Sequence, residues 1–146
     1  MSIKQRRNAA FTLIEIMLVV VIIGILAAVA VPKLAGQAKE AKIRATQSTL
    51  RSIETSLGMY EMKAASFPTT EQGLEALVKK PSELGDDEWN GPYLKEGIPK
   101  DDFNSELVYR SPGEDGKDYD LFSKGPNKQE GDDDDIYAAK GRKAKE

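Results

Sequence analysis

Hydrophobic positions are concentrated in one continuous segment near the start of the chain. Between Phe11 and Val31 the only charged residue is Glu15. A helix over these 21 residues would be about 30 Å long, which matches the hydrocarbon thickness of a bilayer. Residues 19–23 are all β-branched, but in lipid only a helix satisfies its own backbone polar groups. The pattern therefore predicts a membrane-spanning helix over residues 11–32.

A second helical pattern comes next, with one apolar stripe instead of an apolar surface all round. Pro32 and Gly36 weaken the backbone hydrogen bonding locally, so we expect a kink or a melted turn around residues 32–36. Apolar residues then recur at spacings of seven, three, four and three, between polar neighbours. This is the pattern of an amphipathic helix ending near Lys63. The residues of the stripe are Ile43, Leu50, Ile53, Leu57 and Tyr60.

The remaining elements are short and separated by turn residues. Thr69 and Gln72 have the spacing of a capping box, which predicts a short helix from Glu71 to Lys79 before Pro81. Residues 82–105 are predicted to form a loop. Two strand candidates, 106–110 and 118–123, flank a turn-rich segment and predict a hairpin. The fold class is therefore α+β: a long N-terminal helix packed on a small antiparallel sheet, followed by a C-terminal loop.

Composition narrows the possible functions. The chain has no Cys and no His, which excludes disulfides, a thiol nucleophile, a histidine base and the usual zinc sites. It has 21 basic and 24 acidic residues; because three of the basic residues lie in the first ten, the remainder carries a net charge of −6. That charge argues against a nucleic-acid partner. No pattern fixes two carboxylates in a cleft, and there is no glycine-rich nucleotide loop, so we expect no enzymatic activity.

Three interpretations fit residues 1–35. A secretory signal peptide would be cut after Ala30, where Ala28-Val29-Ala30 supplies a small-residue cleavage motif. A plain membrane anchor needs only the apolar length. Neither of these two gives a role to Glu15, although an acid inside a membrane span is costly and marks function by default. The basic start, with Lys4, Arg6 and Arg7, fits the cytoplasmic side of a membrane.

The third interpretation rests on the sequence Ala10-Phe11-Thr12-Leu13-Ile14-Glu15. It resembles the type III signal of type IV pilins and pseudopilins. The resemblance implies that a prepilin peptidase removes the leader, residues 1–10, by cutting between Ala10 and Phe11, and methylates the new N-terminus at Phe11. It also implies that Glu15 pairs with the N-terminus of a neighbouring subunit during assembly. The family usually has Gly where this chain has Ala10.

Later segments are similar to the major, G-type pseudopilin of type II secretion systems. They are residues 67–77, 91–95, 109–113 and 118–123. Where that family commonly has Pro-Trp-Gly after Lys-Asp, this chain has Asp102-Phe103-Asn104. The resemblance implies a single-pass inner-membrane protein with residues 33–146 in the periplasm. Its function would be structural, as the major subunit of a filament that drives folded proteins across the outer membrane.

The resemblance also implies the partners: further copies of the chain in a helical filament, minor pseudopilins, an inner-membrane assembly platform, prepilin peptidase and membrane lipid. The alternative function is a type IV pilin for adhesion or motility. Many such pilins carry a Cys pair in the C-terminal loop, so its absence favours secretion. An exported soluble domain, cut after Ala30, is a third class.

The residues Asp132 to Asp135 form an acidic run near the C-terminus. Taken alone, such a run is a solvated loop whose charges repel one another, and it lacks the spacing of an EF-hand. The resemblance implies instead that the loop holds a structural calcium ion. The candidate side-chain ligands are Asp135, Asp133, Asp132 and Asn127, with carbonyl oxygens around Ser123 and Lys124.

Overall fold

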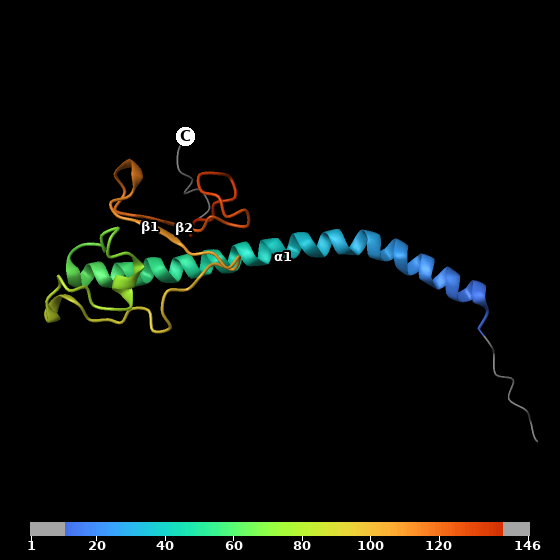
Figure 1. Cartoon of the computed structure of the whole chain (residues 1–146), viewed down its shortest axis with the longest axis horizontal. Coiled ribbons are helices and arrows are strands. Elements are labelled where there is room, and N and C mark those ends of the chain that lie inside the picture. The colour runs from blue at the N-terminus through green and yellow to red at the C-terminus, as the bar shows by residue number, and fades with distance from the viewer. Residues whose placement is uncertain (1–10, 139–146) are drawn as a thin grey trace, which may run out of the picture. The chain divides into compact units, whose positions relative to one another are not determined.

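The structure is a computed structural model that describes residues 11–138 (Figure 1). Its contacts divide the chain into two compact units, residues 1–39 and 40–146. The long helix α1, Leu13–Ala64, begins in the first unit and ends in the second. Its end agrees with the predicted end near Lys63. The family resemblance and the apolar pattern both predicted this helix, and the structure confirms it.

In the first unit, the helix has an exposed apolar surface. All the large apolar side chains from Leu13 to Val31 are exposed in the single chain. Within α1 an 18-residue window reaches a mean hydropathy of 3.0, and none of it is buried. The helix is therefore long and apolar enough to cross a membrane.

The helix continues through residues 32–36, so of the two alternatives expected there, a kink or a melted turn, the melted turn is wrong. A proline inside a helix removes one backbone hydrogen bond and crowds the preceding turn. The segments on both sides are rich in alanine, the strongest helix former, and extending an existing helix is far easier than starting a new one. The two helical patterns in the sequence therefore form one helix.

The second unit is built on the apolar stripe of α1. Leu50, Ile53 and Leu57 have no exposed surface, and Tyr60 is also buried, whereas Ile43 packs at the edge of the core. This confirms the predicted stripe. The other buried residues of this core lie after the helix: Leu74, Ala76, Leu77, Tyr109, Leu121, Ile136 and Ala138.

The sheet consists of two antiparallel strands, β1 (Val108–Arg110) and β2 (Asp120–Phe122) (Figure 1). In its register Tyr109 lies opposite Leu121, and both side chains are buried in the core. The hairpin is as predicted, but each strand is shorter than the predicted ranges 106–110 and 118–123. The Ser111 hydroxyl donates to the Asp118 carbonyl at 3.0 Å, and Ser123 pairs with Ile136 instead of with β1.

The predicted helix from Glu71 to Lys79 is wrong in type and extent. The reciprocal capping-box bonds do form: the Gln72 amide donates to the Thr69 hydroxyl at 3.2 Å, and the Thr69 amide donates to the Gln72 side chain at 3.0 Å. However, Gly73 has φ +57, which ends any α-helical run. After Gly73 the chain forms the short 3₁₀ helix η1, Leu74–Leu77. Two more 3₁₀ turns, η2 (Asp86–Glu88) and η3 (Glu114–Gly116), lie in the later loops.

Candidate functional site

The predicted processing and assembly residues lie at the start of α1. Ala10 is outside the described residues. Phe11 is 77% exposed and precedes the helix, so the predicted cleavage point lies in front of the helical backbone. Glu15 is exposed in the first turn of α1. The region thus places a carboxylate within one helical turn of the N-terminus that cleavage would create.

Thr12 sets where this helix begins, a role that the sequence did not reveal to us. The amide of Glu15 donates to the Thr12 hydroxyl at 3.3 Å, which is the N-cap geometry of a helix that starts at Leu13. The spacing Thr-x-x-Glu immediately before an apolar run carries this signal in the sequence.

The acidic C-terminal loop is closed by a backbone pair. The Ser123 amide donates to the Ile136 carbonyl at 2.9 Å, and the Ile136 amide donates to the Ser123 carbonyl at 2.8 Å. Just inside this neck, Gly125 has φ +62, and a Cβ at this position would lie 2.0 Å from the Asp134 carbonyl oxygen. The two ends of the loop therefore approach so closely that only glycine fits at Gly125.

Three of the predicted ligands take part in hydrogen bonds inside the loop. Asn127 donates to Asp132 at 2.6 Å, and the Asp134 amide donates to the other Asp132 oxygen at 2.9 Å. The Oδ2 atom of Asp135 accepts from the Gly131 amide at 2.8 Å, but its Oδ1 atom is buried with no hydrogen-bond partner. Burial raises the pKa of the Asp135 carboxyl, and the hydrogen bond from Gly131 acts in the opposite direction.

The donor set of the loop is chemically suited to a calcium ion, which takes six to eight oxygens from a flexible site. The buried, unpartnered Oδ1 of Asp135 is the kind of atom that a cation satisfies. No group of three acidic side chains within residues 11–138 is arranged as a metal cluster, so backbone carbonyls would have to supply much of the shell. Asp133 is exposed in the same run. The Lys124 ammonium has no lone pair to offer a cation and lies 3.6 Å from Glu130, so only the carbonyl of Lys124 can serve as a ligand.

Glu130 forms a second ion pair, with Arg110: a guanidinium nitrogen of Arg110 lies 2.5 Å from a carboxylate oxygen of Glu130. The carboxylate of Glu130 raises the pKa of the Arg110 guanidinium. Because Arg110 lies in β1 and Glu130 in the loop, this ion pair fixes part of the loop to the sheet. Neither residue was singled out from the sequence, where 20 positions separate them.

Asp101 is the other contributor that reasoning from the sequence missed. Its side chain is 5% exposed. The Oδ1 atom accepts from the amides of Phe103 and Ser105, at 3.0 and 2.6 Å, and Oδ2 accepts from the Ser123 hydroxyl at 2.6 Å. The two amide bonds are typical of an aspartate that initiates a turn, so Asp101 ahead of Asn104 and Ser105 was the available signal.

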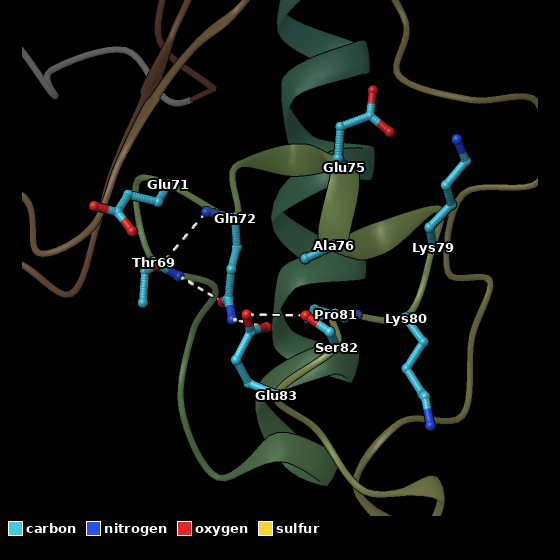
Figure 2. A pocket seen from close by; sticks show the side chains of 10 residues that line it. All are labelled: Thr69, Glu71, Gln72, Glu75, Ala76, Lys79, Lys80, Pro81, Ser82 and Glu83. Carbon is cyan, nitrogen blue, oxygen red and sulfur yellow. Dashed lines mark hydrogen bonds between the residues drawn. The ribbon is translucent and has the colours of Figure 1, made fainter.

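A separate groove of about 470 Å³ lies beside η1. Figure 2 shows that its central polar groups bond to one another: Gln72 bonds to Thr69 and, at 3.4 Å, to Glu83, and Ser82 donates to Glu83 at 3.1 Å. These hydrogen bonds lower the pKa of the Glu83 carboxyl, with its own backbone amide the largest cause. These hydrogen bonds therefore hold the chain segment that follows α1, and they use the polar groups at the centre of the groove.

Two family models match the chain. Residues 5–31 match the prokaryotic N-terminal methylation motif. Residues 33–139 match protein G of the type II secretion system (T2SS). The chain belongs to the protein G family of type II secretion systems. It is a major pseudopilin, a structural protein and not an enzyme, as the sequence predicted.

Relatives of this pseudopilin extend over nearly its whole length. The type II secretion system core protein G of Aeromonas hydrophila is 41% identical over 135 residues, which are 91% of this chain and 93% of that protein. The Pseudomonas aeruginosa core protein G is 41% identical over 133 residues, 90% and 92% of the two chains. The crystal structure of the major pseudopilin from enterohaemorrhagic Escherichia coli matches with a TM-score of 0.59 at 34% identity. That match covers 72% of this chain and 92% of the other.

These matches confirm the pilin-like fold: a long N-terminal helix with a small antiparallel sheet. The methylation motif in a pseudopilin implies processing by a prepilin peptidase and assembly into a filament. The hydrophobic start of α1 fits a pseudopilin anchored in the inner membrane. The alternative of a type IV pilin for adhesion or motility, and that of an exported soluble domain, are set aside by the family match.

Proposed function

We propose that this major pseudopilin is the repeating subunit of a periplasmic filament that drives folded proteins across the outer membrane. The observation that carries the proposal is the exposed apolar surface of α1 from Leu13 to Val31. Such a surface requires either lipid or like-shaped apolar neighbours around it. A subunit stored in the membrane and then added to a bundle of identical helices exchanges the first environment for the second.

The charge of Glu15 fits this exchange. In lipid, an isolated carboxylate is costly. In a filament, the methylated amine of Phe11 in a neighbouring subunit provides a cation, and pairing offsets the burial of both charges. We infer that Glu15 selects the position at which an incoming subunit is accepted.

We infer the same topology and partners as the sequence resemblance implied. The chain crosses the inner membrane once, with the basic residues 1–10 in the cytoplasm and residues 33–146 in the periplasm. Minor pseudopilins and an inner-membrane assembly platform would contact the filament, and membrane lipid would surround the helix before extraction. Because the chain is structural, the energy for assembly comes from a partner.

We further propose that the C-terminal loop binds a structural calcium ion. Asp135, through its unpartnered Oδ1, is the best-supported side-chain ligand, and Asp132 is a candidate whose two oxygens also accept hydrogen bonds within the loop. Asp133 and Asn127 are further candidates, and the carbonyls of Ser123 and Lys124 lie next to the neck of the loop. When bound, the ion supplies positive charge that relieves repulsion among the consecutive aspartates.

Complementation tests the filament function. The chain is expressed in a type II secreting bacterium whose own protein G gene is deleted, together with its cognate secretion components. We expect an exoprotein to return to the medium, and overproduction to give filaments labelled by an antibody against residues 40–138. Filaments that form without restored export would separate assembly from secretion and contradict the proposed role in transport.

A further inference from the structure

The second unit contains a buried aspartate without an ionic partner among the described residues. Asp101 is 5% exposed, and within residues 11–138 no Lys or Arg forms a salt bridge with it. A buried carboxylate is costly unless hydrogen bonds compensate. Here three donors do so: the amides of Phe103 and Ser105 and the hydroxyl of Ser123.

The Ser123 hydroxyl carries this connection into the neck of the C-terminal loop. It donates to Asp101 and at the same time accepts a hydrogen bond from the Gly125 amide at 3.0 Å. The backbone of Ser123 pairs with Ile136, the residue next to Asp135. One serine therefore fixes the point where the loop leaves β2, the turn at Gly125, and the point where the loop returns.

The other end of the connection is α1. The Asp102 amide donates a hydrogen bond to the Thr46 hydroxyl at 3.1 Å, and the same hydroxyl donates to the Asp102 carboxylate at 3.2 Å. Thr46 is fully buried. Asp102 thus attaches this turn to α1, and its neighbour Asp101 attaches the same turn to the neck of the loop. The turn cannot shift without breaking one of these two attachments.

We propose that Asp101 is a positioning residue for the cation of the C-terminal loop, acting through Ser123. The inference rests on the proposed calcium site. In this proposal Asp101 lies outside the ligand set; it holds the hydroxyl of Ser123, and thereby the Ser123 backbone that pairs with Ile136, the residue next to the candidate ligand Asp135. Groups that orient metal ligands without binding the metal typically change metal affinity by about 10- to 100-fold when they are replaced.

Asp101→Asn tests this with almost no change of shape. The Asn oxygen can still accept from Phe103 and Ser105, but an NH₂ group replaces the acceptor of the Ser123 hydroxyl. The hydroxyl hydrogen of Ser123 then loses its acceptor, while the hydroxyl oxygen of Ser123 still accepts a hydrogen bond from the Gly125 amide. Ser123→Ala removes the same link from the other side. Ser105→Ala is the matched control, because the Ser105 hydroxyl is buried without a partner and its amide bond to Asp101 is retained.

The mature chain is purified in micelles of a nonionic detergent, and calcium binding is measured by isothermal titration at a temperature where circular dichroism shows each variant folded. We expect Asp101→Asn and Ser123→Ala each to weaken calcium binding by about 10- to 100-fold, with no further loss in the double variant. Ser105→Ala should bind like the original chain. In calcium-free buffer, both variants should also exchange the Gly125 and Ile136 amide hydrogens faster.

The outcomes separate the two proposals. Calcium binding in the original chain with unchanged affinity in both variants would overturn the role of Asp101 and leave the calcium site standing. No calcium binding in the original chain would overturn both. Should Asp101→Asn fail to fold, Ser123→Ala decides, because it leaves Asp101 with both amide donors: unchanged affinity contradicts the proposal, and weakened affinity supports it.

Discussion

The phenol of Tyr109 donates a 2.8 Å hydrogen bond to the carbonyl oxygen of Pro68. Tyr109 lies in β1, and Pro68 lies in the segment that leaves the end of α1. Both residues are buried, so the bond ties the sheet to the exit of the helix where water cannot replace either partner.

Replacing Tyr109 by Phe should therefore destabilise the second unit. The change leaves the Pro68 carbonyl buried without a donor, which costs about 1–3 kcal/mol. Urea denaturation of the mature chain in detergent, monitored by circular dichroism, measures the free energy of unfolding. Tyr93→Phe is the control, because the Tyr93 hydroxyl accepts from the exposed amide of Asn90 and its removal should cost less. Equal losses in the two variants would contradict the importance of burial.

The stability of the second unit at alkaline pH should depend on the ionisation of Tyr109. Burial is the main cause that raises the pKa of Tyr109, and it also raises the pKa of Tyr60. A group whose pKa is raised by folding contributes stability that is fully present below its unfolded pKa, about 10 for tyrosine, and is lost as the pH rises above it. We expect the free energy of unfolding to fall above about pH 10 and to fall less steeply in Tyr109→Phe. A slope that is unchanged by this substitution would mean that other groups dominate alkaline unfolding.

The sequence was sufficient where one periodic signal dominates. The apolar run, the stripe Leu50–Ile53–Leu57 and the hairpin were all predicted because helix and strand periods are local properties. The errors lie where a single residue or a distant contact decides. The positive φ of Gly73 turns a capped helix into a 3₁₀ turn, and alanine-rich flanks carry α1 through Pro32.

The candidate site was predictable only in part, because some of its contacts join residues that are distant in the sequence. The acidic run is visible in the sequence, and the closing of its neck results from the pairing of Ser123 with Ile136. The contribution of Asp101 depends on a contact across 22 positions, and that of Glu130 on one with Arg110. No local pattern specifies such pairs, so only folding reveals them.

Processing should produce a mature chain that begins with N-methylated Phe11. The helix begins only at Leu13, so the bond before Phe11 precedes the regular hydrogen-bond ladder. Intact mass and N-terminal sequencing of protein purified from cells with a prepilin peptidase measure the cleavage point. Ala10→Gly restores the residue usual in the family and should be cut as well or better. A mature chain that starts at Val31 would favour the signal-peptide interpretation.

Glu15→Val should separate membrane insertion from assembly. Removing a charge from the span favours insertion, so the variant should fractionate with the inner membrane in normal amount. Filament yield and exoprotein export should drop to background, because the amine of the neighbouring Phe11 loses its partner. Glu40→Gln is the control, since the ion pair that Glu40 forms with Arg44 is exposed and such pairs contribute little. Normal filaments from Glu15→Val would disprove the pairing.

Calcium should stabilise the second unit. An ion that binds only the folded state adds about 2.7 kcal/mol when its free concentration is a hundredfold above Kd. The mature chain in micelles should therefore unfold at a clearly lower temperature in EGTA than in millimolar calcium. Asp135→Ala should remove most of this difference, whereas Asp134→Ala, which retains the amide bond to Asp132, should remove less. Identical melting curves in both buffers would show that the acidic run is solvated and carries no ion.

The backbone pair between Ser123 and Ile136 has a consequence for how this family can vary. Residues 124–135 leave and rejoin the rest of the unit at one closed neck, and Glu130 is also held to β1 by Arg110. A change in the number of residues between these fixed points affects folding mainly through the entropy of ring closure. Doubling the length of a flexible loop costs only about 0.6 kcal/mol. Insertions in this segment should therefore be accepted easily where they spare Glu130 and the candidate ligands Asp132 and Asp135, as long as the neck is kept.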